Sequence, residues 1–266
     1  MEGNSVILNN IPFEKGPLTT MIERLCKTMN SMDKEWSKGI KPATQNQIQS
    51  VIDILKQYGK NVPLAYLLFL QTMGMDDNGL LEHEWDGFTE INMDAALGTY
   101  REYYDDFVPY GFLPFSFHWT EAILSMELTE ADNPPIYNGY AKTPFSGSFE
   151  NYLFQMAFRQ VENMQFLYQV RCATSKEEFR DILAEKAAQN FSWTKPMELI
   201  ETLLKPYQLQ KAWFSDDVRF CGISSEYLIS VDLHWALNIR ISSDNHTVLQ
   251  NMKNSLTYLF GDALVN

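Results

Sequence analysis

The sequence is poor in cysteine, and this limits the chemistry that it can carry. Its three cysteines, Cys26, Cys172 and Cys221, are far apart among 266 residues and form no Cys-x-x-Cys pair. Zinc ribbons and disulfide frameworks need paired or regularly spaced cysteines, so neither is predicted. We expect buried free thiols, as in a protein of the reducing cytoplasm.

Long apolar stretches are also missing. No run of 18 apolar residues occurs, so we expect no membrane-spanning helix and no membrane partner. The first residues, MEGNSVILNNIPFEKG, have neither the basic start nor the apolar segment of a secretory signal. Together these absences predict a cytoplasmic protein.

Motifs of catalysis and cofactor binding are absent as well. The chain contains no Gly-x-Ser-x-Gly elbow, no Walker loop, no Gly-x-Gly-x-x-Gly fingerprint and no His-Glu-x-x-His pair. Its four histidines are scattered, and no two have the spacing of metal ligands. We therefore expect no enzymatic activity, no cofactor and no metal site. One alternative stays open, a small-ligand or catalytic site around His83 and Glu84, where an imidazole lies among carboxylates.

Basic residues are nearly absent from one long stretch. Residues 76–141 contain 14 Asp and Glu residues but a single Lys or Arg, Arg101, whereas the rest of the chain contains 20 acidic and 20 basic residues. The whole formal charge of −13 therefore lies in this stretch. Because binding to phosphate backbones requires a basic surface, we expect no nucleic-acid partner. An acidic face favours a basic protein partner, whose approach it steers, or serves only as a solvated surface.

Apolar and aromatic residues, by contrast, are plentiful. They make up 45% and 14% of the chain, enough to form a sizeable core. Helical periodicity predicts a first helix over 18–37 and a second that begins after Thr44. Thr44 and Gln47 have the spacing of a capping box, and Gly59 is a suitable helix end.

A third, shorter helix is predicted by VPLAYLLFLQTMG at 62–74. Pro63 suits a first helical turn, because its missing N–H is not needed there. Tyr66 and Phe69 are three positions apart, so they share one face and should enter the core. Gly74 ends the helix.

Beyond this helix the pattern changes to that of strands. Short apolar groups, namely FLPFSFHW at 112–119, AILSMEL at 122–128 and PPIYNGY at 134–140, are separated by turn residues. They predict strands, with one helix over 94–105 and a closing helix after Ser148. N-terminal helices, a mostly antiparallel or mixed sheet and a closing helix make an α+β domain.

The remainder predicts a second, smaller α+β unit. Two amphipathic helices, at 175–189 and 195–208, precede three segments that alternate like antiparallel strands and a final helix at 247–260. We place the domain boundary between 170 and 171. This gives an N-terminal domain of residues 1–170 and a C-terminal unit of residues 171–266, whose role the sequence does not indicate.

The acidic stretch also holds the best candidates for a binding surface. Four of these candidates are the consecutive residues 103–106 of a predicted helix, and their side chains cannot all be buried. Tyrosine and tryptophan anchor protein interfaces, while carboxylates pair with Lys or Arg of a partner. The residues that we expect to contact a partner are Trp85, Tyr103, Tyr104, Asp105 and Asp106. Core roles for the three aromatic residues remain an alternative.

Several of these motifs resemble a known superfamily. The helix after Thr44, followed by apolar-Pro-x-x-Tyr-x-x-Phe-Leu-x-x-x-Gly at 62–74, is similar to the N-terminal signature of the SUKH superfamily. That superfamily includes Smi/Knr-type regulators of fungal cell-wall synthesis and many bacterial immunity proteins. The acidic segment, FLPFSFHW, AILSMEL, PPIYNGY and SFENYL continue the resemblance in order, over roughly residues 40–160.

The resemblance implies a non-enzymatic α+β domain that binds other proteins. In bacteria the usual role of such a domain is immunity: it binds a toxin domain, commonly a nuclease or deaminase, and blocks it. We therefore expect an immunity-type protein whose acidic face binds a basic toxin domain. A regulatory scaffold without a toxin partner is the alternative, and the sequence leaves the oligomeric state open.

Overall fold

The computed structural model describes residues 13–81, 101–118, 121–139, 143–189, 195–234 and 236–260. The chain divides into two compact units. Glu14–Ala157 form the N-terminal unit, and Phe13 joins the described residues from 158 onward in the C-terminal unit. Each unit combines helices with an antiparallel sheet, which confirms the predicted α+β class.

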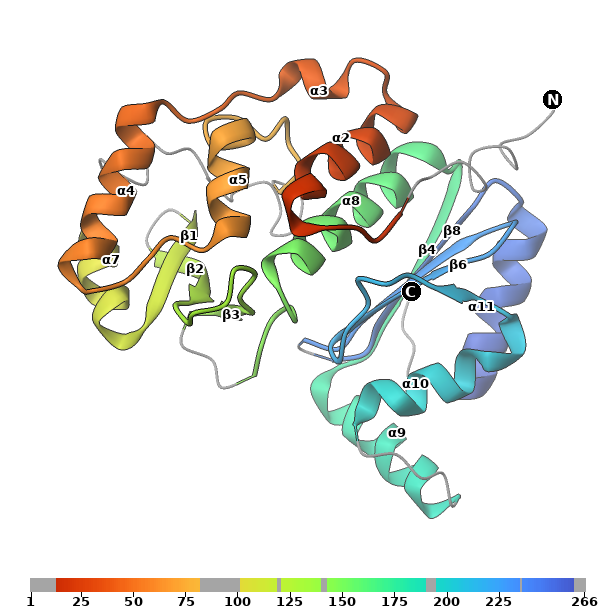
Figure 1. Cartoon of the computed structure of the whole chain (residues 1–266). Coiled ribbons are helices and arrows are strands. Elements are labelled where there is room, and N and C mark those ends of the chain that lie inside the picture. The colour runs from red at the N-terminus through yellow and green to blue at the C-terminus, as the bar shows by residue number, and fades with distance from the viewer. Residues whose placement is uncertain are drawn as a thin grey trace. The chain divides into compact units, whose positions relative to one another are not determined.

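Helices make up the first half of the N-terminal unit. A 3-10 turn, η1 (Leu18–Thr20), leads into α2 (Met21–Met32), and α3 (Trp36–Gly39), α4 (Gln45–Gln57) and α5 (Leu64–Met73) follow. The single helix predicted over 18–37 is divided, because Asp33 adopts an extended conformation (φ −126°, ψ 108°) after α2. Figure 1 shows α4 and α5 side by side.

Local signals explain where α4 and α5 begin and end. Thr44 Oγ1 accepts a hydrogen bond from Gln47 N, and Gln47 Oε1 accepts one from Thr44 N, which is the predicted capping box. Gly59, after α4, has a φ of 67°, a left-handed conformation that favours glycine. Gly74, after α5, is right-handed, and glycine is needed there for close packing. A Cβ at this position would lie 2.8 Å from the backbone of Leu70.

Aromatic rings fill the core of the N-terminal unit. Tyr66 and Phe69 of α5 are buried, as predicted. Both meet Phe149 edge-on, with ring centroids 5.7 and 5.5 Å apart, and Phe115 meets the same ring at 5.4 Å. Edge-to-face geometry of this kind adds to the stabilisation that burial alone gives.

The sheet of the N-terminal unit has the order β1-β2-β3 and is antiparallel. Its strands are β1 (Phe112–His118), β2 (Glu121–Glu127) and β3 (Ile136–Asn138), which confirms the three predicted strands. A short helix, α7 (Arg101–Phe107), and a 3-10 turn, η3 (Val108–Tyr110), lead into β1. The helix α8 (Phe149–Gln165) closes the unit, and Ser148 Oγ accepts a hydrogen bond from Asn151 N at its start.

A buried ion pair joins α2 to the first turn of α8. Arg24 and Glu150 form this pair, and the side chain of each is 10% exposed. Arg24 also donates to the backbone carbonyl oxygens of Glu14 (2.9 Å) and Pro17 (3.1 Å). The arginine therefore holds the chain that precedes α2 in place as well as neutralising the buried carboxylate.

The C-terminal unit is built on a five-stranded antiparallel sheet of order β4-β8-β7-β6-β5. Its elements are β4 (Tyr168–Ala173), α9 (Lys176–Ala188), α10 (Pro196–Leu204), η4 (Lys205–Tyr207), β5 (Gln210–Lys211), β6 (Arg219–Ile223), β7 (Leu228–Asp232), β8 (Asn238–Ser243) and α11 (His246–Phe260). The sequence predicted three strands here. β4 was missed, and β5 and β6 fall within a single predicted segment.

Along the chain, the division between the two compact units falls between Ala157 and Phe158, inside α8. The predicted boundary was between residues 170 and 171. A boundary after Val170 would cut β4 in two. Because β4 pairs with β8 along its whole length, the strand belongs to the C-terminal unit.

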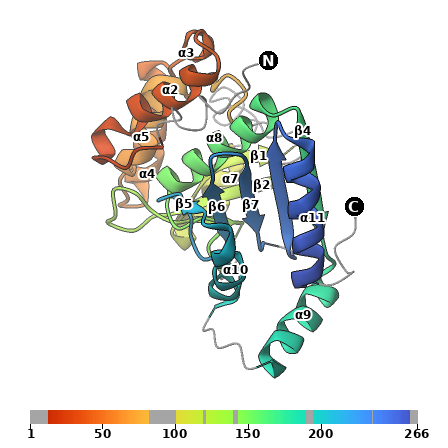
Figure 2. The ribbon, with the colours of Figure 1, turned by 90° about the vertical axis from the view of Figure 1, so that its right-hand side faces the viewer.

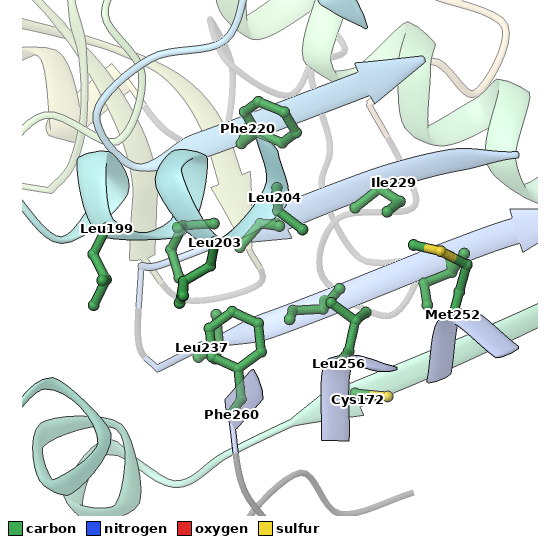
Figure 3. Packing of buried hydrophobic residues seen from close by; sticks show 14 of the residues in the cluster. Cys172, Leu199, Leu203, Leu204, Phe220, Ile229, Leu237, Met252, Leu256 and Phe260 are labelled. Atoms are coloured by element: carbon green, nitrogen blue, oxygen red, sulfur yellow. The ribbon is translucent and has the colours of Figure 1, made fainter. Parts of the chain in front are cut away.

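Apolar residues from α10 and α11 cover one face of the C-terminal sheet, and Figure 2 shows α11 lying along the strands. Figure 3 shows how Leu203, Leu256 and Phe260 of these helices converge with Ile229 of β7. A smaller aromatic group forms elsewhere in this unit. The ring of Phe13 lies 5.5 Å from that of Phe158 and 5.2 Å from that of Phe214.

Candidate functional site: the acidic surface around α7

The structure separates the four consecutive candidates on α7. Asp105 and Asp106 are exposed, Tyr103 is half-buried and Tyr104 is fully buried. Successive helix residues point about 100° apart, so burial of Tyr104 and Phe107 directs the intervening carboxylates toward solvent. α7 therefore brings an aromatic anchor into the core and presents two acids outward.

The prediction that Tyr104 contacts a partner is therefore wrong, because Tyr104 is a core residue. Its side chain is 0% exposed, and its hydroxyl has no hydrogen-bond partner among the described residues. Burial raises the pKa of Tyr104 above its ordinary value, so the side chain stays neutral. Trp85, the fifth candidate, lies outside the described residues, as do His83 and Glu84.

Asp105 is held in place by the end of α4. The Tyr58 hydroxyl, in the residue that follows α4, donates a 3.0 Å hydrogen bond to Asp105 Oδ1. This bond, with a smaller contribution from the charge of Asp105, raises the pKa of Tyr58. A carboxylate fixed in this way loses less side-chain entropy when it pairs with a partner than a freely rotating one would.

An exposed aromatic residue follows the two aspartates. Tyr110, at the end of η3, is 75% exposed, and Gly111 then turns the chain into β1 with a φ of 87°. Leu128 N donates a 2.7 Å hydrogen bond to Gly111 O, which brings the acidic end of β2 beside this turn. Glu127 of β2 lies directly opposite Phe112 and accepts a hydrogen bond from Tyr137 (3.4 Å).

We call Asp105, Asp106, Tyr110 and Glu127 the α7 acidic surface. Within the described part of the stretch 101–139, the single basic residue is Arg101. Carboxylates beside an exposed tyrosine can pair with Lys or Arg of a partner while the ring supplies apolar contact area. Among the described residues, including this surface, no three His, Cys, Asp or Glu side chains gather to hold a metal ion. No described helix is long and apolar enough to cross a membrane.

The structure also contains a polar cluster in the C-terminal unit that the sequence did not indicate. Ser230 Oγ of β7 donates a 2.9 Å hydrogen bond to Glu162 Oε2 of α8, and this glutamate is 1% exposed. Its second carboxyl oxygen, Oε1, has no hydrogen-bond partner among the described residues. Burial raises the pKa of Glu162 to about 7, although the Ser230 bond and nearby arginines oppose the rise.

An ion pair lies near this glutamate. Arg219 of β6 donates to Asp232 Oδ2 of β7 at 2.7 and 3.2 Å, and His234 Nδ1 lies 3.1 Å from Asp232 Oδ1. Burial opposes ionisation of Asp232, yet the arginine and the histidine lower its pKa well below its usual range. The pair is therefore ionised at neutral pH.

One signal in the sequence could have revealed the cluster. In β7 and β8, apolar residues of the core face alternate with Ser230, Asp232 and Arg240. Such alternation places the polar residues together on the opposite face of the sheet. The contribution of Glu162 depends on α8 packing against that face, which strand periodicity does not reveal.

Comparisons with known proteins give no match: no family model, no curated protein and no solved structure is significantly similar to this chain. The resemblance to the SUKH superfamily therefore rests on the motifs in residues 40–160.

Proposed function

We propose that this chain is a non-enzymatic protein-binding module of immunity type, which acts in the cytoplasm and binds and neutralises a basic toxin domain. The α7 acidic surface is its contact surface. The observation that carries the proposal is the pair of exposed aspartates on α7, one of them fixed by Tyr58, next to the exposed ring of Tyr110. The SUKH-like motifs of the same unit support it.

Physical reasoning connects this surface to inhibition. A surface with one sign of charge accelerates the approach of an oppositely charged partner and selects against partners of like charge. Nucleases and other enzymes that act on nucleic acids need basic substrate sites. An acidic surface docked on such a site would exclude the substrate without any chemistry of its own.

The experiment starts from a low-salt pull-down with the tagged full-length protein, with bound proteins identified by mass spectrometry. The captured partner is then purified, and its association rate is measured over a range of salt concentrations. Asp105→Lys with Asp106→Lys should slow association by about tenfold at low salt and flatten its salt dependence. A stoichiometric basic partner that dissociates as salt rises, and whose activity the protein blocks, would support the proposal.

Two control variants separate surface charge from general damage. Glu23→Lys makes the same kind of charge change at an exposed residue of α2, in the same unit, and should leave association unchanged. Tyr104→Phe removes only a buried hydroxyl and should also leave association unchanged. If the double aspartate variant associates as fast as the unaltered protein, the assigned surface is wrong. Recovery of pathway or envelope proteins with no toxic activity would favour the regulatory scaffold.

A further inference from the structure

One edge of the C-terminal sheet, along β4, is open. β4 is the first strand in the order β4-β8-β7-β6-β5, and among the described strands it pairs with β8 alone. At the opposite edge β5 has only two residues, and so short a strand offers little backbone for another chain to pair with. β4 has six residues, half of them exposed. This edge therefore lacks the protection that a very short strand gives.

The hydrogen bonds of the ladder show which backbone groups of β4 face outward. Just after β4, Thr174 N donates a 2.9 Å hydrogen bond to Leu237 O, just before β8. Because bonded pairs alternate along an antiparallel ladder, the even-numbered residues of β4 bond to β8. The N–H and C=O groups of the odd-numbered residues, Gln169, Arg171 and Ala173, point away from β8. No described residue forms a hydrogen bond with these six groups.

Large apolar side chains are exposed beside the same edge. Met164 and Leu167 lie just before β4, and Tyr168 is its first residue. Of the five large apolar side chains that are exposed in the described part of the chain, three lie within positions 164–168. Leu167 N donates a 3.0 Å hydrogen bond to Asp244 Oδ1, and the ring of Tyr168 meets that of His246 edge-on at 5.4 Å. An exposed apolar group beside an unpaired strand edge is typical of an interaction surface.

The charge of the C-terminal unit favours a second copy of this chain as the partner. Residues 158–266 contain 13 acidic and 11 basic residues, so their formal charge is only −2. A strongly basic or strongly acidic partner would gain little electrostatic attraction from such a unit. Two copies of it can meet with little repulsion.

The sequence of β4 complements itself in one antiparallel register. With Val170 on a two-fold axis, Gln169 lies directly opposite Arg171 of the second copy, and their outward backbone groups can exchange both hydrogen bonds. Tyr168 then lies opposite Cys172 of the second copy, on the face that carries the core. A register centred on Arg171 would instead oppose two arginines, which destabilises a sheet.

We propose that β4 pairs with β4 of a second copy in this register, so that two five-stranded sheets join into one continuous sheet. The contact uses the same surface on both copies, and it closes at a dimer. Main-chain hydrogen bonds supply the pairing, and Leu167 and Tyr168 add apolar contact. A contact built on one short strand belongs to the small interfaces, below about 1,200 Å² in total, so we expect a weak and reversible dimer. This inference is independent of the toxin-binding proposal, because it uses the C-terminal unit alone.

The test is sedimentation velocity of the full-length protein from about 1 to about 200 µM, a range suited to a weak dimer. The sedimentation coefficient should rise with concentration toward that of a dimer. Arg171→Pro removes an outward N–H and no hydrogen bond to β8, so it should weaken dimerisation by about tenfold or more. Arg171→Ala keeps that N–H, and it should dimerise like the unaltered protein.

A second pair of variants tests the apolar contact. Leu167→Glu places a carboxylate where apolar area should be buried, so it should also weaken dimerisation by about tenfold or more. Tyr258→Glu makes the same kind of change on α11. Tyr258 follows the buried Leu256 by two positions, about 200° around the helix, so it faces away from the sheet. This control should leave dimerisation unchanged.

Crosslinking tests the register. Val170→Cys, oxidised with copper phenanthroline, should form a disulfide between two copies, because opposed residues that do not share hydrogen bonds have Cα atoms about 4.5 Å apart. Gln169→Cys lies two positions from its counterpart in this register, beyond the reach of a disulfide, and should not crosslink. The unaltered protein, with its three free cysteines, gives the baseline.

Each outcome decides for or against the proposal. A monomer at every concentration overturns it and leaves the edge to an extended segment of another protein. A dimer that both Arg171→Pro and Leu167→Glu retain at full affinity also overturns it, because such a dimer uses a different surface. Crosslinking of Gln169→Cys but not of Val170→Cys overturns the register. Leu167 is exposed and precedes β4, so its variant carries the test if Arg171→Pro fails to fold.

Discussion

Glu162 makes the stability of the C-terminal unit depend on pH, and Glu162→Gln should remove that dependence. The glutamine amide keeps the size of the side chain and an oxygen that accepts the hydrogen bond of Ser230, but it never carries a charge. Any difference in pH profile between the two proteins therefore reports ionisation of this one buried carboxyl group.

The size of the effect follows from the two pKa values. Folding raises the pKa of Glu162 from an ordinary 4.5 to about 7, so the folded protein binds the proton more tightly than the unfolded chain does. For an acid of this kind, the contribution to stability is complete below pH 4.5 and is lost as pH rises through 7. One pKa unit corresponds to about 1.4 kcal/mol, so the total loss is about 3 kcal/mol, and most of it falls between roughly pH 5 and 8.5.

Hydrogen–deuterium exchange of β7 and β8 amides, corrected for intrinsic rates, measures the opening free energy of this unit without reference to the rest of the chain. The opening free energy of the unaltered protein, minus that of Glu162→Gln, should fall by about 2–3 kcal/mol from pH 5 to 8.5. Glu177→Gln, at an exposed position of α9, should run parallel to the unaltered protein. Parallel profiles for Glu162→Gln as well would refute the reasoning.

Three further substitutions test the packing and capping of the N-terminal unit by urea or thermal denaturation. Arg24→Met should cost about 3–5 kcal/mol, because it leaves the Glu150 carboxylate buried without its ion pair. Adding Glu150→Gln should restore part of that loss, and a double variant no more stable than the single one would contradict this cause. Gly74→Ala should cost about 1–3 kcal/mol despite its ordinary dihedral angles, since the new Cβ collides with backbone; unchanged stability would show that the backbone yields. Thr44→Ala should cost about 1 kcal/mol and Thr44→Ser almost nothing, whereas equal losses would rule out the hydroxyl cap.

Local patterns predicted much of the fold. Three features depend on residues within a few positions of one another, so local spacing is enough to predict them. They are the capping box at Thr44, the buried face of α5 and the three strands of the first sheet. β4 was missed because most of its residues are exposed, so YQVRCA shows no clear alternation. Its identity as a strand depends on pairing with β8, which lies far along the chain.

The candidate site was also predictable only in part, because part of it depends on contacts between residues far apart in the sequence. Helix geometry indicated that some of the residues from 103 to 106 must face solvent, but not which ones. The direction in which α7 packs decides that Tyr104 is inside and Asp105 outside, and this direction is a property of the tertiary structure. For the cluster around Glu162, alternation along β7 and β8 places the polar strand residues on one face, but no sequence spacing connects that face to Glu162 of α8.

The place of Phe13 has a consequence for synthesis of the chain. Its ring packs with Phe158 and Phe214, so it belongs to the C-terminal unit, whose other described residues are translated after the intervening unit. Domains generally fold as they emerge, and the intervening unit can therefore assemble while Phe13 still lacks its partners. The C-terminal unit is completed by a residue that is translated before the whole of the intervening unit. A deletion that removes Phe13 should consequently weaken the C-terminal unit, although the intervening unit separates the two in sequence.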